Sequence, residues 1–374
     1  MRILFDARSV RTPSGRYILR GLAAGWRDDT RVSAVMAAVP RGFPLKDLPD
    51  GIAPVRVASA NWATHILTEL PRAADRVRAD VIFCPNGIGP ADARVVVFLQ
   101  DMYHFAFKAS SGSAAQVALQ RAIRVGIRAL SHRHYKVAVA VSRTIAREAE
   151  RRFHIPIEIV PNGVDVGGLK WDGDGDTVFV LGGIGARKDE RTALKAWSML
   201  HNRPPGLTLS IAGVEPKERR KSLRLLAQKL GVATTVSIRG TVSRPRYLGY
   251  LSRCRLAISC SKLESFGLPV AEALMMRAPL ACTAIEPHAD LVASAGGGAL
   301  FDPGDAGQLA ELISKSLAGE PPARSAPVVS GWSWASRAMQ HVDVFERYVF
   351  NRYASLTSQR QSATSTRSAS VRVE

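Results

Sequence analysis

Cysteine is scarce in this sequence, and the few cysteines stand apart from one another. They are Cys84, Cys254, Cys260 and Cys282. None belongs to the C-x2-C pair of a zinc site, and four in 374 residues is far below the density of a disulfide-stapled secreted domain. We therefore expect free thiols and a cytoplasmic protein.

Long hydrophobic runs are missing as well. No stretch approaches the ~20 apolar residues that a membrane-spanning helix needs. The N-terminal MRILFDARSV reaches Asp6 before it forms the apolar core of a signal peptide. With 46% hydrophobic and 22% charged residues, the composition is that of a globular protein, and the length suits two domains.

Acidic residues are too few to balance the basic ones. There are 32 Asp and Glu against 51 Lys and Arg, so the net charge is +19. Such an excess favours partners that carry phosphate, whether nucleotide, nucleic acid or anionic lipid. A basic nucleic-acid-binding protein is one alternative, but no nucleic acid is expected as a partner because the charge is spread over both halves and no recognition motif occurs.

Residues 117–133 predict an Arg-rich amphipathic helix. Leu119, Ile123, Ile127 and Leu130 share one face, and Arg121, Arg124, Arg128 and His132 share the other. Two interpretations stay open. Either the apolar face is buried and the arginines are solvated, or the helix contacts the anionic cytoplasmic face of a membrane.

Short runs rich in Val, Ile and Leu alternate with helical patterns, which is typical of βα units around a parallel sheet. The first series of predicted strands covers residues 3–6, 32–39, 55–58, 81–84, 95–99, 137–141 and 157–160. The second covers residues 178–182, 208–213, 236–239, 256–259, 280–283 and 299–301. Two such series predict an α/β fold of two Rossmann-like, doubly wound domains, with ligands in a cleft at the carboxyl ends of the strands.

The domain boundaries follow from composition. Gly, Asp and Asn crowd residues 161–176, as in a linker. We expect an N-terminal domain over 1–165 and a second domain over 166–335. A helix over 336–354 is expected to pack back on the first domain, and the Ser-, Thr- and Arg-rich residues 355–374 are expected to be disordered.

The segment SKLESFGLPVAEALMMRAPL, residues 261–280, contains most of the candidate chemistry. Glu264 follows a predicted strand, and Gly267 allows a ligand to approach the backbone closely. Pro269 suits the first turn of a helix, so Glu272 falls one turn inside it. The segment therefore predicts a loop and a helix N-terminus at the carboxyl edge of a sheet.

Backbone amides at this helix N-terminus form a predicted anion site. The amides of Phe266, Gly267 and Leu268 would point toward phosphate or sugar oxygens. Beside a phosphate, Glu264 needs a role such as accepting hydrogen bonds from sugar hydroxyls or stabilising positive charge on a sugar ring. The alternative is that Glu264 and Glu272 are a helix-dipole partner and a solvated helix residue.

A second segment, GGIGARKDERTAL, combines glycines with a basic pair. Arg187 and Lys188 would suit a diphosphate, although such residues taken alone are usually solvated charges at a helix start. A dinucleotide fingerprint from Gly183 would need Gly at position 188, and no P-loop G-K-S/T occurs. The nearby WDGDGD predicts a flexible acidic turn rather than a metal site.

The stretch ESFGLPVAE, residues 264–272, resembles the E-x7-E motif of the GT-B, family 4 retaining glycosyltransferases. Residues 141–153 and 159–165 resemble the end of the first domain in that family, and residues 297–305 resemble the stretch after the motif helix. The resemblance runs from residue 1 to about 350. It implies a GT-B fold, a nucleotide-sugar donor as co-substrate and no obligatory metal or other cofactor.

The resemblance also implies roles for the matching residues. Glu264 would meet the donor sugar's hydroxyls and Glu272 the ribose, while the basic pair would hold the diphosphate. The implied donor-binding residues are Gly15, Arg187, Lys188, Phe266, Gly267, Leu268 and Glu272. The implied catalytic residues are Glu264 and Asp101.

Two stretches of the first domain depart from the family pattern. TPSGRY resembles the glycine loop that faces the diphosphate but keeps only Gly15 of the usual glycines. In VFLQDMYHF, Gln100 stands where the family has His, followed by Asp101. Gln forms hydrogen bonds but transfers no proton near neutral pH, so Gln100 is an acceptor-side candidate without an acid or base role. His104 is either its substitute or a packing residue among aromatic neighbours.

Together these features predict a retaining hexosyltransferase that acts on a saccharide or lipid-linked acceptor in cell-surface polysaccharide synthesis. The ESFGLP context favours mannose from GDP-mannose. We expect a cytoplasmic enzyme, peripheral on the membrane if the Arg-rich helix contacts lipid. Because Gln100 and the thinned glycine loop depart from the pattern, a non-catalytic GT-B scaffold is a further alternative.

Overall fold

The chain divides into two compact units in a computed structural model. One unit comprises Met1–Gly163 and the chain from Trp334 onward, and the other comprises Val164–Ser333. The structure describes residues 1–350 except 10–12, 46–47, 59–61, 86, 101–125, 127–131, 174, 184–185 and 327–330. The Arg-rich segment therefore lies almost entirely outside the described residues, and the C-terminal tail lies wholly outside them.

The first unit is built on a seven-stranded parallel sheet with the order β3-β2-β1-β4-β5-β6-β7. Its strands are β1 (Arg2–Asp6), β2 (Ala34–Pro40), β3 (Ala53–Val57), β4 (Val81–Cys84), β5 (Val95–Leu99), β6 (Val137–Ala140) and β7 (Ile157–Ile159). Every side chain of β4, β5 and β6 is buried, because central strands of a parallel sheet are covered on both faces. The helices that the structure describes in this unit are α1 (Pro13–Arg27), α2 (Trp62–Thr64), α3 (Leu70–Arg76), α5 (Arg143–Glu150) and α12 (Trp334–Tyr348). A π-helical turn, His65–Glu69, joins α2 and α3, and short 3-10 turns lie at Ala7–Ser9 and His132–His134.

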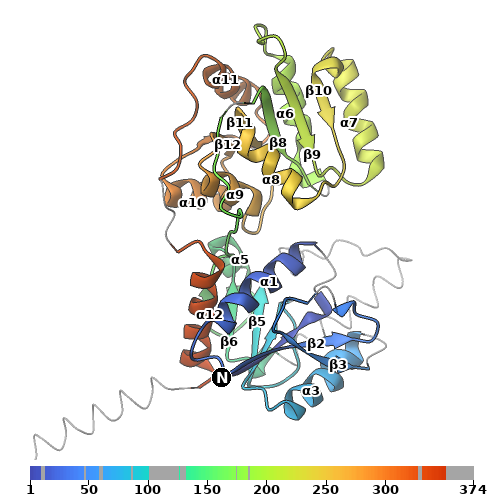
Figure 1. Cartoon of the computed structure of the whole chain (residues 1–374), viewed down its shortest axis with the longest axis vertical. Coiled ribbons are helices and arrows are strands. Elements are labelled where there is room, and N and C mark those ends of the chain that lie inside the picture. The colour runs from blue at the N-terminus through green and yellow to red at the C-terminus, as the bar shows by residue number, and fades with distance from the viewer. Residues whose placement is uncertain are drawn as a thin grey trace, which may run out of the picture. The chain divides into compact units, whose positions relative to one another are not determined.

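Helix α12 returns to the first unit after the whole second unit, and it packs against α1 (Figure 1). Two glycines of α1 make this contact close. A Cβ at Gly21 would lie 2.1 Å from the Trp334 ring, and one at Gly25 would lie 2.5 Å from the Ala338 Cβ. Larger residues at these positions would push the two helices apart.

The second unit has a six-stranded parallel sheet with the order β10-β9-β8-β11-β12-β13. The strands are β8 (Thr177–Leu181), β9 (Thr208–Ala212), β10 (Val236–Ile238), β11 (Leu256–Ser259), β12 (Leu280–Thr283) and β13 (Ala299–Phe301). The α-helices are α6 (Glu190–Ser198), α7 (Lys217–Lys229), α8 (Arg244–Arg253), α9 (Leu268–Met276), α10 (Glu286–Ala295) and α11 (Ala306–Leu317), with 3-10 turns at Ala186–Lys188 and Ala233–Thr235.

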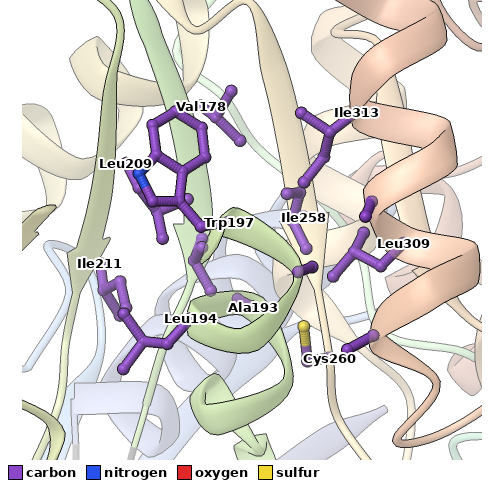
Figure 2. Close-up of a cluster of buried hydrophobic side chains, with 14 of the residues drawn as sticks. Val178, Ala193, Leu194, Trp197, Leu209, Ile211, Ile258, Cys260, Leu309 and Ile313 are labelled. Carbon is purple, nitrogen blue, oxygen red and sulfur yellow. The ribbon is translucent and has the colours of Figure 1, made fainter. Parts of the chain in front are cut away.

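Alternation along the strands separates the two faces of this sheet. Val178 and Val180 join a buried cluster with Trp197 of α6 and Leu309 of α11, part of which Figure 2 shows. Phe179 faces the other way, where its ring contacts tyrosines of α8. Thus α6 and α11 cover one face of the sheet, and α8 covers part of the opposite face.

All thirteen predicted strands are confirmed, with ends that differ by a few residues. The parallel pairing and the two doubly wound sheets confirm the predicted GT-B fold class. The strand order of each sheet reverses beside its first strand, which brings several strand-end loops together at the carboxyl edge.

Candidate functional site

The carboxyl edge of the second sheet gathers the charged residues that the sequence singled out. Strand β8 is followed by the 3-10 turn Ala186–Lys188, and β11 is followed by the loop that contains Glu264. These two strands are neighbours in the sheet, so their following loops meet. The backbone joins them too, because Lys262 N donates to Arg187 O at 2.7 Å.

Glu264 lies between two cations. Lys188 Nζ donates to Glu264 Oε1 at 2.7 Å, and Arg187 Nη1 lies 2.9 Å from the same oxygen. Lys188 and Glu264 are both buried, and only 8% of Glu264 is exposed. The structure therefore brings Glu264 together with two adjacent residues that lie more than seventy positions before it in the sequence.

The charge of Glu264 is set by these neighbours. Burial alone would raise the pKa of Glu264, but the positive charges of Lys188 and Arg187 and the hydrogen bond from Lys188 outweigh it and lower that pKa to about 2. Glu264 is thus an ionised acceptor at neutral pH, held next to two donors that suit phosphate oxygens.

A helix N-terminus adjoins this cluster. Gly267 caps α9 with φ +95°, a conformation that favours glycine, and Pro269 stands in the first turn, as the sequence predicted. Within the described residues, the amides of Phe266, Gly267 and Leu268 have no hydrogen-bond partner. They are available to an anion at the positive end of the helix.

His288 of α10 supports this turn, and nothing in the sequence pointed to it. A Cβ at Gly267 would lie 3.0 Å from His288 Cδ2. His288 Nδ1 lies 3.2 Å from the Thr283 carbonyl oxygen, and burial lowers the pKa of His288 to about 4. The ring is therefore neutral at neutral pH. No pattern in the sequence predicted the contact between His288 and Gly267, because Gly267 precedes α9 and His288 belongs to α10.

Glu272 forms a second cluster. It lies inside α9, is 3% exposed and accepts a hydrogen bond from Arg244 Nη1 at 2.7 Å. Arg244 Nη2 also donates to the Asp165 carbonyl oxygen, which ties α8 to the segment that begins this unit. Burial raises the pKa of Glu272, and the charge of Arg244 only partly opposes this rise.

Arg244 was also missed as a partner of Glu272. The only sequence signal was the concentration of arginines between residues 239 and 246. The pairing depends on α8 and α9 meeting in the fold, which no spacing along the chain encodes.

The candidates of the first unit are placed only in part. Gly15 lies in the first turn of α1, and Gln100 follows β5 in a half-buried position. Asp101 and His104 lie outside the described residues. The structure therefore brings Arg187 and Lys188 together with Glu264 and places Glu272 in a second cluster, whereas the candidates of the first unit stay predictions.

The described part of the chain has neither a metal-ligand cluster nor a membrane-spanning helix. No three His, Cys, Asp or Glu side chains there converge as metal ligands. None of the helices that the structure describes is long and apolar enough to span a bilayer.

Two family models match the chain, one in each half. Residues 19–167 match Glycosyltransferase Family 4, and residues 166–327 match Glycosyl transferases group 1. Together they cover well over half of the chain. The chain belongs to the group 1 glycosyltransferases. Enzymes of this family transfer glycosyl groups from nucleotide-sugar donors to acceptors. The search of curated proteins found no match to the sequence.

Solved structures of other glycosyltransferases share the fold. A glycosyltransferase from Rickettsia africae aligns with a TM-score of 0.67 at 14% identity, over 94% of this chain and 99% of the other. HepE from Anabaena, solved with UDP and glucose, aligns at 0.63 and 17% identity, over 97% and 100%. Sucrose-phosphate synthase from Thermosynechococcus elongatus aligns at 0.62 and 14%, also over 97% and 100%. At these identities the likeness shows the GT-B fold alone.

Proposed function

We propose that this group 1 glycosyltransferase transfers a hexose with retention of configuration and binds its donor at the carboxyl edge of the second sheet. The observation that carries the proposal is the cluster of buried Lys188, half-buried Arg187 and buried Glu264, with contacts of 2.7 and 2.9 Å, beside the N-terminus of α9. Cations, open amides and an ionised carboxylate are the groups that a sugar diphosphate requires.

In the proposed complex, the diphosphate lies on Arg187 and Lys188 and on the amides of Phe266 to Leu268. An ammonium group has three donor hydrogens, so Lys188 can bind phosphate while it still holds Glu264. Glu264 then accepts hydrogen bonds from the sugar's hydroxyls, and Glu272 meets the ribose. Without a donor, Glu264 is the counter-charge that keeps the two cations in place.

The proposed reaction needs no protein nucleophile. The bond between the sugar's anomeric carbon and the diphosphate breaks as the acceptor oxygen bonds to that carbon from the same face. The acceptor's proton moves to the departing phosphate oxygen. Lys188 and Arg187 stabilise the charge that grows on the leaving diphosphate, and Glu264 stabilises positive charge on the sugar ring.

The first unit is proposed to contribute the acceptor side. Gly15 would let the backbone approach the diphosphate, Asp101 would assist at the reacting sugar, and Gln100 and His104 would hydrogen-bond the acceptor. Since Gln100 transfers no proton, this assignment agrees with a reaction in which the leaving phosphate is the base.

The donor and acceptor are also proposed. The ESFGLP context supports mannose from GDP-mannose, and the Arg-rich segment 117–133 supports a saccharide or lipid-linked acceptor at an anionic membrane surface, as in cell-surface polysaccharide synthesis. Flotation with vesicles that contain anionic lipid tests whether the protein binds such a membrane surface. Binding that does not depend on the anionic lipid would remove this part of the proposal.

A panel of nucleotide sugars tests the reaction. The full chain is incubated with GDP-mannose, UDP-glucose and related donors, release of nucleoside diphosphate is measured, and the anomeric configuration of the product is read by NMR. We expect turnover with one donor class and retention. No binding or hydrolysis of any donor would favour the non-catalytic scaffold, and inversion would overturn the proposed mechanism.

A further inference from the structure

A cavity of about 680 Å³ in the second unit belongs to neither carboxylate cluster. It lies between α8 and the sheet and reaches the residues at which three strands begin, Thr177, Thr208 and Val236. Lys188 and Glu264, by contrast, follow the carboxyl ends of β8 and β11. The lining also extends to Arg239, just after β10, but it includes none of the residues of the two carboxylate clusters, so the residues that line the cavity are not those of the proposed donor site.

The wall of this cavity on the sheet side is made of hydroxyl groups. Thr177 pairs with Thr208, and Ser210 pairs with Ser237, so these side chains form adjacent rows on the face toward α8. On the opposite face of the same strands, Leu209 and the other alternate residues are apolar and belong to the core. The cavity face is therefore polar where a buried sheet face is ordinarily apolar.

Ser210 supplies an independent sign of a ligand. It is 5% exposed, it lines the cavity, and its Oγ has no hydrogen-bond partner among the described residues. Buried hydroxyls are nearly always paired, because an unpaired one loses its bonds to water without replacement. A ligand oxygen in the cavity would satisfy Ser210.

The rest of the lining is cationic, with Arg246 and Arg253 from α8 and Arg239 from the loop after β10. Arg239 Nη1 and Arg246 Nε both donate to the Tyr250 hydroxyl, at 2.6 and 2.7 Å, and both guanidinium groups lie over its ring. Arg253 lies about one turn beyond Tyr250 on α8 and has no carboxylate partner among the described residues. The described lining thus holds three arginines and no Asp or Glu, and an anion would offset their mutual repulsion.

We propose that this cavity binds a phosphorylated sugar, with its phosphate on Arg239, Arg246 and Arg253. The sugar's hydroxyls lie against the Ser and Thr side chains of the sheet, including Ser210. A bare phosphate uses only the arginines, and a neutral sugar uses only the hydroxyls, so the ester is the ligand that matches both walls.

Calorimetry on the full chain tests this site with glucose 6-phosphate, glucose 1-phosphate and ribose 5-phosphate, against inorganic phosphate and glucose. At least one ester is expected to bind more tightly than phosphate, with no binding of glucose. No binding of any ester, or equal binding of phosphate and the best ester, would overturn the proposal.

Variants locate the binding. Arg253→Gln and Arg246→Gln are each expected to weaken the best ester about tenfold, since each loses a charge-assisted hydrogen bond. Ser210→Ala is expected to weaken it severalfold. Arg41→Gln, an exposed arginine of the first unit, is the matched control and should change nothing.

Lys188→Ala separates this site from the donor site. Ester binding that survives Lys188→Ala but falls in Arg253→Gln supports the second site, whatever the outcome of the donor panel. Binding lost in Lys188→Ala, or unchanged in both Arg253→Gln and Arg246→Gln, would overturn it.

Discussion

Glu264 and Glu272 belong to one motif, and both are buried, yet their surroundings move their pKa values in opposite directions. Glu264 contacts two cations that outweigh the effect of burial, whereas Glu272 pairs with one cation, Arg244, among the described residues, and burial prevails. The number of paired cations therefore decides which carboxylate stays firmly ionised. The difference supports the proposed division of roles, in which Glu264 stabilises charge and Glu272 binds the nucleotide.

The largest expected effect comes from Lys188→Ala, which leaves Glu264 with a single cation, as Glu272 has. We expect kcat/KM for the donor to fall by about 100- to 1000-fold, because a fixed charge on the leaving group is lost. Steady-state kinetics with the donor found in the panel measures this. Lys195→Ala, an exposed lysine of α6, is the control and should retain activity. Activity of Lys188→Ala within threefold of the parent would contradict the proposed role.

Removing each charge in turn sharpens the comparison between the two carboxylates. Glu264→Gln is expected to lower kcat about 100-fold, since the carboxylate acts as charge develops. Glu272→Gln is expected to act mainly on the donor KM, by about tenfold, since a hydrogen bond to the nucleotide is weakened. Equal losses of kcat in the two variants would show that the two residues do not have different roles.

A smaller effect is expected from Gly267→Ala, which disturbs the turn between the carboxylates. The added Cβ would meet His288 in a left-handed conformation, at a cost of about 1–3 kcal/mol in the free energy of unfolding. Donor KM should rise about tenfold. Gly231→Ala is the matched control, because Gly231 has φ +68° but open space around its Cβ position. Gly231→Ala should lower the free energy of unfolding without changing the donor KM. A rise in KM equal to that of Gly267→Ala would count against a role for the Gly267 turn.

The smallest effect is expected in the pH dependence of stability, measured by urea unfolding between pH 2 and pH 7. The lowered pKa of Glu264 stabilises the fold above the ordinary Glu value of 4.5, and this contribution is lost as the pH falls toward 2. The raised pKa of Glu272 contributes stability at low pH that is lost as the pH rises above 4.5.

The two Gln variants test this directly. The stability difference between the parent and Glu264→Gln should grow with pH over the acidic range. The difference between the parent and Glu272→Gln should shrink as the pH rises through and above 4.5. If the two stability differences changed with pH in the same direction, the environments of Glu264 and Glu272 would not differ as described.

The sequence predicted the strands because each is an apolar run bounded by turn residues, such as Val95–Leu99. It predicted Glu264, Gly267 and Glu272 as a group because they lie in one loop and one helix. It did not predict that Arg244 pairs with Glu272 or that His288 lies under Gly267. Those contacts join separate elements, and only the strand order brings such elements together.

The interrupted first unit has a consequence for synthesis of the protein. The Trp334 ring lies against Gly21 and Gly163, and α12 is the last described helix of the chain. As the nascent polypeptide leaves the ribosome, its first half cannot complete its own core. Its core is completed only when α12 has been synthesised, and α12 follows the whole second unit. The second unit, Val164–Ser333, is therefore free to fold earlier. The part of the enzyme translated first is therefore the last to be finished.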